Sequence, residues 1–196
     1  MKLILASSNS HKADEFSKFF DEKIISIEVA SKRLDVIENG QTFQANALKK
    51  AEAYYKTFKA PVLSDDSGIT VEALPGELGI HSARFGGEHL DDRRRCLLLL
   101  EKLKEVENRQ AFFTCYLCFY LSPQEIFFFE GRMAGEISQA MSGSGGFGYD
   151  PVFIPAGHGE KVSVACIPDW KKENSHRAQA CRAAQNFFQE RTGQFT

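Results

Sequence analysis

The chain has 196 residues, a formal net charge of −2, and 43% hydrophobic and 26% charged residues. Such a composition is ordinary for a globular protein, and the length allows one large domain or two small lobes. The near-neutral charge argues against nucleic acid or a membrane surface as a partner. No apolar run is long enough to span a membrane, and the apolar start MKLILA is too short for a secretion signal.

The chain carries five cysteines, at positions 96, 115, 118, 166 and 181. An odd number in a chain of this size favours reduced thiols and a cytoplasmic location. Cys115 and Cys118 form a C-x-x-C within the apolar run AFFTCYLCFYL, but no second pair or nearby histidine completes a zinc site. Residues three apart in a strand point to opposite faces, so we interpret both as core residues.

The first half of the chain alternates strand and helix patterns. A short buried strand is predicted over 2–7, followed over 8–20 by a loop that turns into a helix. Alternating residues predict a strand over 24–30, and apolar residues at helical spacing predict a helix over 42–58. The segment 61–74 is predicted as a strand, a sharp polar turn and a second strand.

The second half predicts an amphipathic helix over 92–106 and a long antiparallel hairpin over 111–137, with its turn at 122–124. A short strand interrupted by prolines is expected over 150–155, and a helix over 176–191 closes the chain. This order predicts an α/β fold, with flanking helices around a central mixed β-sheet.

The glycine-rich segment GSGGFGYDP at 143–151 fits the pattern G-x-G-x-x-G of dinucleotide-binding loops. That fingerprint needs a helix directly after it, and Pro151 and Pro155 argue against one. We interpret the segment as a flexible loop that passes close to a ligand, where Phe147 and Tyr149 offer faces for stacking a nucleobase. A plain connector with an aromatic residue in the core is the alternative.

Three polar clusters carry further signals. SSNSHK at 7–12 lies between a strand and a helix, where backbone N–H groups and Lys12 attract phosphate, although an ordinary helix cap explains it equally well. LSDDSG at 63–68 puts two carboxylates side by side, and a hard cation such as Mg²⁺ would relieve their mutual repulsion. Glu38 is another candidate ligand. A solvated turn is the alternative interpretation.

The third cluster is KKENSHR at 171–177, with donors at Lys171, His176 and Arg177. Its alternative is a helix capped by Ser175, and a serine hydrolase is excluded because G-x-S-x-G is absent. Together the three clusters and the glycine loop predict one nucleotide-hydrolysing site.

Five ordered blocks resemble the inosine triphosphate pyrophosphatases, the Ham1-like purine nucleoside triphosphate pyrophosphatases, in their bacterial dITP/XTP form. They are LASSNSHKADEF, ENGQTFQANALKKA, LSDDSGITVEALPGELGIHSARFGG, SGSGGFGYDPVFIP and SHRAQA. The resemblance spans nearly the whole chain and implies a single domain over 1–196 with an elongated, two-lobed subunit. It also implies a homodimer, dependence on Mg²⁺, and cleavage of dITP, ITP, XTP or dXTP to a monophosphate and pyrophosphate, which cleanses the nucleotide pool.

The resemblance also implies roles for individual residues. Glu38 and Asp65 would help to hold Mg²⁺, while Asp66 would accept the proton and also touch the metal. Phe147 would stack on the base, and His176 and Arg177 would read its edge. The full set that would contact substrate is Ser7, Ser8, Asn9, Ser10, His11, Lys12, Ser67, Phe147, Gly148, Tyr149, Asp150, Lys171, His176 and Arg177.

Ser8 departs from the family pattern, in which glycine is common at this position. The resulting LASSNS resembles the opening of the Maf septum nucleotide pyrophosphatases, which act on methylated or pyrimidine nucleotides, so a Maf-like enzyme is the alternative. A nucleotide-binding module without turnover is a further alternative, against which the acidic trio of Glu38, Asp65 and Asp66 argues.

Overall fold

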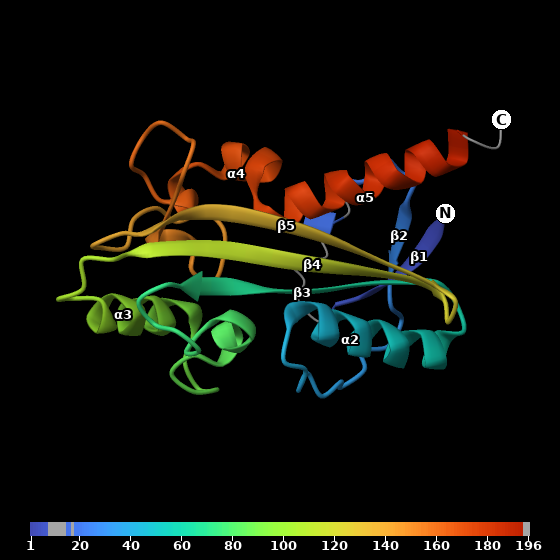
Figure 1. Cartoon of the computed structure of the whole chain (residues 1–196), viewed down its shortest axis with the longest axis horizontal. Coiled ribbons are helices and arrows are strands. Elements are labelled where there is room, and N and C mark those ends of the chain that lie inside the picture. Colours follow the sequence, from blue (N-terminus) through green and yellow to red (C-terminus); the bar gives the residue numbers. More distant parts are fainter. Residues whose placement is uncertain (8–14, 17, 194–196) are drawn as a thin grey trace. The chain divides into compact units, whose positions relative to one another are not determined.

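The computed structural model describes residues 1–7, 15, 16 and 18–193, with residues 192 and 193 described by their backbone only. Its sheet has six strands in the order β2-β1-β3-β4-β5-β6 (Figure 1). The strands are β1 Lys2–Ala6, β2 Ser26–Val29, β3 Val62–Val71, β4 Gln110–Ser122, β5 Glu125–Ile137 and β6 Phe153–Pro155. Strand β1 runs parallel to β2 and β3, whereas β5 and β6 are antiparallel, so the predicted mixed sheet is confirmed.

Helices flank this sheet, which confirms the α/β class. They are α2 Phe43–Phe58, α3 Asp92–Lys102, α4 Pro168–Asn174 and α5 His176–Gly193, with 3₁₀ turns η1 Gly79–Arg84, η2 Asp150–Val152 and η3 Val164–Cys166. The two longer internal helices begin at side-chain caps, because Thr42 accepts a hydrogen bond from the N–H of Ala45 and Asp91 accepts one from Arg94. Among the described residues, no helix is both long and apolar enough to cross a membrane.

The chain divides into two compact units, each built from separate stretches of sequence. Unit 1 comprises 1–66, 115–131 and 177–196, and unit 2 comprises 67–114 and 132–176. The prediction of a single domain over 1–196 stays a prediction.

Unit 1 has an apolar core on each face of its sheet. On one face α5 packs with Phe16 and Phe20 against β-strand residues that include Cys115 and Phe119. On the other face α2 packs against residues that include Cys118. Figure 1 shows α2 and α5 on opposite sides of the strands. Cys115 and Cys118 are buried and lie in different cores, which confirms their interpretation as core residues that point to opposite faces.

Unit 2 has one apolar core, formed where α3 and η1 pack with the strands and the segment after the glycine loop. Arg109 supports it, because its guanidinium donates to the carbonyl oxygens of Leu103, Ile137 and Ser138 at 2.6–2.7 Å. No α-helix follows the glycine loop directly: the 3₁₀ turn η2 and the short strand β6 do. The expectation that the prolines prevent a helix directly after this loop is therefore confirmed.

One prediction about local structure was wrong, and one helix was not predicted. The polar run 63–68 is not a turn, since it lies inside the continuous strand β3. Ser64, Asp65 and Asp66 are buried here because each finds a partner in the protein. The hydroxyl of Ser64, for example, donates to the carbonyl of Ala47 at 2.6 Å. The helix α4 was also missed, because it is only seven residues long and shows little apolar periodicity.

Candidate active site

Neighbouring carboxylates on β3 face opposite sides of the strand. Residues 62–66 alternate between the two cores of unit 1, so that Leu63 packs with the α5 core and Val62 with the α2 core. Asp65 lies on the same face of β3 as Leu63 and faces Arg177 at the start of α5. Asp66 lies on the opposite face, toward α2, and contacts Asn46. The two aspartates therefore have different partners: a guanidinium for Asp65 and a side-chain amide for Asp66.

Asp66 is held from the α2 side. The side-chain amide of Asn46 donates a hydrogen bond to Asp66 Oδ2 at 3.0 Å. The side chain of Asn46 is buried, while Asp66 retains 9% exposure at the edge of the core. An amide donor favours the ionised form of a carboxylate, which is the form that can accept a proton or bind a cation.

Asp65 is instead part of a buried ion-pair cluster. Arg177 Nη2 lies 3.9 Å from Asp65 Oδ2, and Arg177 Nη1 also pairs with Glu15, while the guanidinium lies 5.6 Å from the ring centre of Phe16. Burial works against the charge of Arg177, but neighbouring groups, led by Cys115 and followed by Asp65 and Glu15, keep its pKa above the ordinary value. Asp65 thus serves to neutralise a buried cation within unit 1.

Lys50, on α2, contacts two of the acidic residues, Asp65 and Glu38. Its ammonium donates to the backbone carbonyl of Asp65 at 2.9 Å and lies 3.1 Å from Glu38 Oε1. Burial alone would lower the pKa of Lys50, but the negative charges of Asp65, Glu38 and Asp66 raise it above its usual value. The lysine is therefore a permanent positive charge beside the carboxylates.

The donor set of unit 1 fits a hard cation that binds together with phosphates. Among the described residues, no three His, Cys, Asp or Glu side chains form a ready-made metal cluster. Mg²⁺, however, is usually held by one or two carboxylates together with waters and substrate phosphates. Glu38, Asp65 and Asp66 offer carboxylate oxygens of this kind. Two of them are also in ion pairs, Asp65 with Arg177 and Glu38 with Lys50.

The glycine loop in unit 2 is built around a buried ion pair. Lys171 Nζ lies 2.6 Å from Asp150 Oδ2, and the same oxygen accepts a hydrogen bond from the backbone N–H of Phe147 at 2.9 Å. The ammonium also lies 4.7 Å from the centre of the Phe147 ring. A Cβ at Gly146 would approach Asp150 Oδ2 to 1.9 Å, so the carboxylate fits only because residue 146 is glycine.

Further hydrogen bonds tie the same loop to η1 and α3. The N–H of Gly148 donates to Asp92 Oδ2 at 2.8 Å, and the hydroxyl of Tyr149 donates to the carbonyl of Ser82 at 2.7 Å. The thiol of Cys96 reaches the carbonyl of Gly148 at 3.4 Å. Tyr149 is accordingly a core residue whose hydroxyl anchors the loop, and its buried ring does not lie open for stacking.

The remaining predicted residues fall in several places. His176 stacks on Phe113 in unit 2, with ring centres 4.9 Å apart and an angle of 9° between the planes. Ser7 directly follows β1 and Ser67 lies within β3, and both are half-buried. Five predicted phosphate-binding residues lie outside the described part of the chain, namely Ser8, Asn9, Ser10, His11 and Lys12. That all these residues serve one site stays a prediction.

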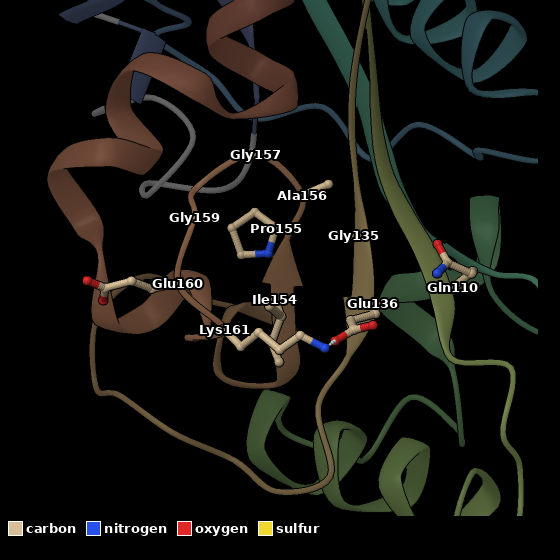
Figure 2. A pocket seen from close by; sticks show the side chains of 10 residues that line it. All are labelled: Gln110, Gly135, Glu136, Ile154, Pro155, Ala156, Gly157, Gly159, Glu160 and Lys161. Atoms are coloured by element: carbon tan, nitrogen blue, oxygen red, sulfur yellow. Dashed lines mark hydrogen bonds and ion pairs between the residues drawn. The ribbon is translucent and has the colours of Figure 1, made fainter.

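A groove of about 280 Å³ in unit 2 lies apart from the predicted residues of that unit. Figure 2 shows it along β5 and β6, with Glu136 pointing toward Lys161 at 3.5 Å and glycines at 135, 157 and 159 forming part of its wall. None of the predicted substrate or metal residues lines it. We therefore do not assign the nucleotide to this groove.

Reasoning from the sequence missed three residues of unit 1 that contact the predicted ones. They are Glu15, Asn46 and Lys50. All three lie inside the blocks ADEF and NALKKA that carry the family resemblance. Their position in the motif was thus the available signal, but only the folded chain shows that Glu15 pairs with Arg177, Asn46 with Asp66 and Lys50 with Glu38.

Fold and side chains together define an α/β protein with an acidic cluster on its central sheet and a buried lysine beside an aromatic loop. Residues 3–187 match the model of the Ham1 family. The chain belongs to that family.

Named relatives and solved structures agree with this assignment. The dITP/XTP pyrophosphatase of Aquifex aeolicus is 39% identical over 191 residues, which cover 93% of this chain and 94% of the relative. That of Porphyromonas gingivalis is 40% identical, over 95% and 97% of the two chains. The structure of the Staphylococcus aureus Ham1 protein matches with a TM-score of 0.86 and 34% identity, covering 97% of this chain and all of that one. A HAM1 protein from Coxiella burnetii gives a TM-score of 0.87 at 31% identity, over 97% and 99% of the chains.

Proposed function

We propose that this chain hydrolyses the triphosphates of deaminated purines, dITP or ITP and XTP or dXTP, to the nucleoside monophosphate and pyrophosphate. The proposal is supported by the dITP/XTP pyrophosphatases to which the chain is similar. The observation that carries it is Asp66, a nearly buried carboxylate that Asn46 holds on the side of β3 that faces α2. A residue so placed suits the transfer of a proton from an attacking water.

In the proposed mechanism, Asp66 accepts that proton as the water attacks the α-phosphorus, and pyrophosphate leaves. Lys50 supplies a fixed positive charge beside the carboxylates, which offsets the charge that develops on the phosphates. Glu38, Asp65 and Asp66 would hold Mg²⁺. When bound, the cation would supply further charge neutralisation at the phosphates.

The base would be recognised by residues of the glycine loop and the 171–177 cluster. Phe147 would stack on the purine, and Lys171, which lies over the same ring, would donate to the 6-oxo group. Adenine carries a 6-amino group at that position, which is itself a hydrogen-bond donor. The two donors would face each other without an acceptor, so adenine would be disfavoured. We also propose that His176 and Arg177 read the base edge, and that 7–12 and Ser67 contact the nucleotide.

The proposal extends to the setting of the enzyme. We propose a homodimer that acts in the cytoplasm on free nucleotides, with no nucleic acid or membrane as partner. Its role would be to remove deaminated nucleotides before a polymerase uses them. Sedimentation equilibrium of the purified chain tests the dimer directly, because a single species of about 22 kDa would contradict it.

The deciding experiment incubates the purified protein with Mg²⁺ and, separately, dITP, XTP, dATP, dGTP and dTTP. Monophosphate and pyrophosphate should form from dITP and XTP, with little from the other three. In water labelled with ¹⁸O, the label should enter the monophosphate, because the attack is at the α-phosphorus. Turnover mainly of dTTP would favour a Maf-like enzyme, and binding without turnover would favour a nucleotide-binding module.

A further inference from the structure

Asn46 is the residue through which the acidic cluster of unit 1 is connected. It lies in the first turn of α2, and its side chain is 1% exposed. Its amide donates to Asp66 Oδ2 at 3.0 Å, and its carbonyl oxygen accepts the backbone N–H of Gly40 at 2.7 Å. One buried side chain thus joins a carboxylate on β3 to the loop that carries Glu38.

The orientation of this amide follows from its two partners. The N–H of Gly40 can only donate, and the ionised carboxylate of Asp66 can only accept. The oxygen of Asn46 must therefore face Gly40 and its NH₂ group must face Asp66. A side chain with a donor and an acceptor on one planar group is needed here, so most substitutions lose at least one of the two bonds.

Gly40 permits the close approach that this connection needs. A Cβ at position 40 would lie 2.6 Å from Asn46 Oδ1, 3.0 Å from the Cβ of Ala45 and 3.1 Å from the backbone nitrogen of Asn46. All three atoms belong to the first turn of α2, and the Cβ of Ala45 and the nitrogen of Asn46 cannot shift without moving the helix. A side chain at position 40 would therefore push the Glu38 loop away from Asn46.

We propose that Asn46 is a positioning residue, which fixes the carboxylate of Asp66 and couples it to the loop that carries Glu38. The proposal rests on the role of Asp66 given under Proposed function. In this role Asn46 acts on the reaction only through Asp66. It acts by keeping Asp66 in one orientation, and a misplaced catalytic group slows the chemical step more than it weakens substrate binding.

The kinetic test compares Asn46→Ala with Gln44→Ala, which removes an exposed amide two residues earlier on the same helix. Asn46→Ala should lower kcat for dITP on the order of 10–100-fold, with KM changed by no more than about threefold. Gly40→Ala should reproduce this loss, and Gln44→Ala should not. Introduced into the Asp66→Asn variant, Asn46→Ala should cause little further loss, because the two changes remove one function.

A spectroscopic test is independent of turnover. In the ¹H–¹⁵N spectrum, Asp66→Asn should shift the backbone amide signal of Gly40 in the otherwise unchanged protein. The same substitution should leave the Gly40 signal in place when residue 46 is alanine, because the connecting side chain is gone. Thermal unfolding of each variant identifies losses that come only from a smaller folded fraction.

Each outcome decides one question. An Asn46→Ala variant with normal kcat, or one whose loss adds in full to that of Asp66→Asn, would overturn the positioning role. So would a Gly40 signal that responds to Asp66→Asn equally with and without Asn46. If the wild-type chain hydrolyses no nucleotide, the proposed function fails, and the spectra still decide whether Asn46 couples the two segments.

Discussion

Lys171 and Asp150 form an ion pair of 2.6 Å in which both side chains are almost fully buried, at 9% and 4% exposure. Such a pair does not have to stabilise the fold strongly, but removal of one partner leaves a buried charge without compensation. Lys171→Met should therefore lower the free energy of unfolding by about 3–5 kcal/mol and loosen the glycine loop. Chemical denaturation measures the loss.

Lys172 provides the matched control for that prediction. It pairs with Asp169 at 2.7 Å three residues earlier, but both side chains are exposed to solvent. Lys172→Met should change the free energy of unfolding little, because water solvates the remaining carboxylate. If both lysine variants were equally stable, the ion pair at Asp150 would not anchor the loop.

The two aspartates of β3 should respond differently to the same substitution. Asp66→Asn should lower kcat by about 10²–10⁴-fold while nucleotide binding and stability are largely kept, because the proton acceptor is lost. Asp65→Asn should instead lower stability by about 3 kcal/mol, because Arg177 loses a buried partner. Parallel measurements of kcat, of nucleotide binding by calorimetry and of unfolding in urea test the contrast. Near-normal turnover of Asp66→Asn would contradict its role.

Two glycines of the same loop should differ in their tolerance of alanine. Gly148 has a positive φ of 63° but open space where a Cβ would lie, so Gly148→Ala should cost only about 1–2 kcal/mol of backbone strain. Gly146 has a φ of 75° and the carboxylate of Asp150 at 1.9 Å from that Cβ position. Gly146→Ala should therefore be clearly less stable than Gly148→Ala in thermal unfolding, and equal losses would contradict the steric argument.

The cysteines should differ in reactivity. Burial raises the pKa of Cys96 and of Cys118 to about 12, so neither forms an appreciable thiolate at pH 8. Cys166 is the exposed member of the set. In the native protein iodoacetamide should label Cys166 rapidly, and Cys96 and Cys118 should react only after unfolding. Peptide mass spectrometry after timed labelling reads the sites, and fast native labelling of Cys118 would show that its core opens easily.

The sequence predicted the elements whose signal is periodic and long. The helix that became α2 and the hairpin of β4 and β5 each repeat their pattern over more than ten residues, and both were found close to their observed bounds. The run LSDDSG was mistaken for a turn because short polar residues beside glycine usually form one. Only the folded chain supplies Arg177, Asn46 and the carbonyl of Ala47, which allow these polar groups to be buried in a strand.

Prediction of the candidate site was limited for a similar reason. Motif positions suggested Glu38, Asp65 and Asp66 as a group and gave the role of proton acceptor to Asp66, but no physical difference between the two aspartates is visible in the sequence. The difference arises because adjacent strand residues face different cores, and it depends on which helix covers each face. The partners Asn46 and Glu15 come from distant segments, and no local pattern links them to β3.

Burial of residues 62–66 on both faces of β3 has a consequence for how the strand finds its place during folding. When both sides of a strand are apolar and enclosed, a slip of one residue exchanges one buried side chain for another, and hydrophobicity hardly distinguishes the two pairings. The polar partners do distinguish them, since a slip would bring Ser64 or Asp66 opposite Arg177 and would misplace the partner of Asn46. The same two aspartates that we assign to different tasks in the folded protein therefore also select its alignment against its neighbours.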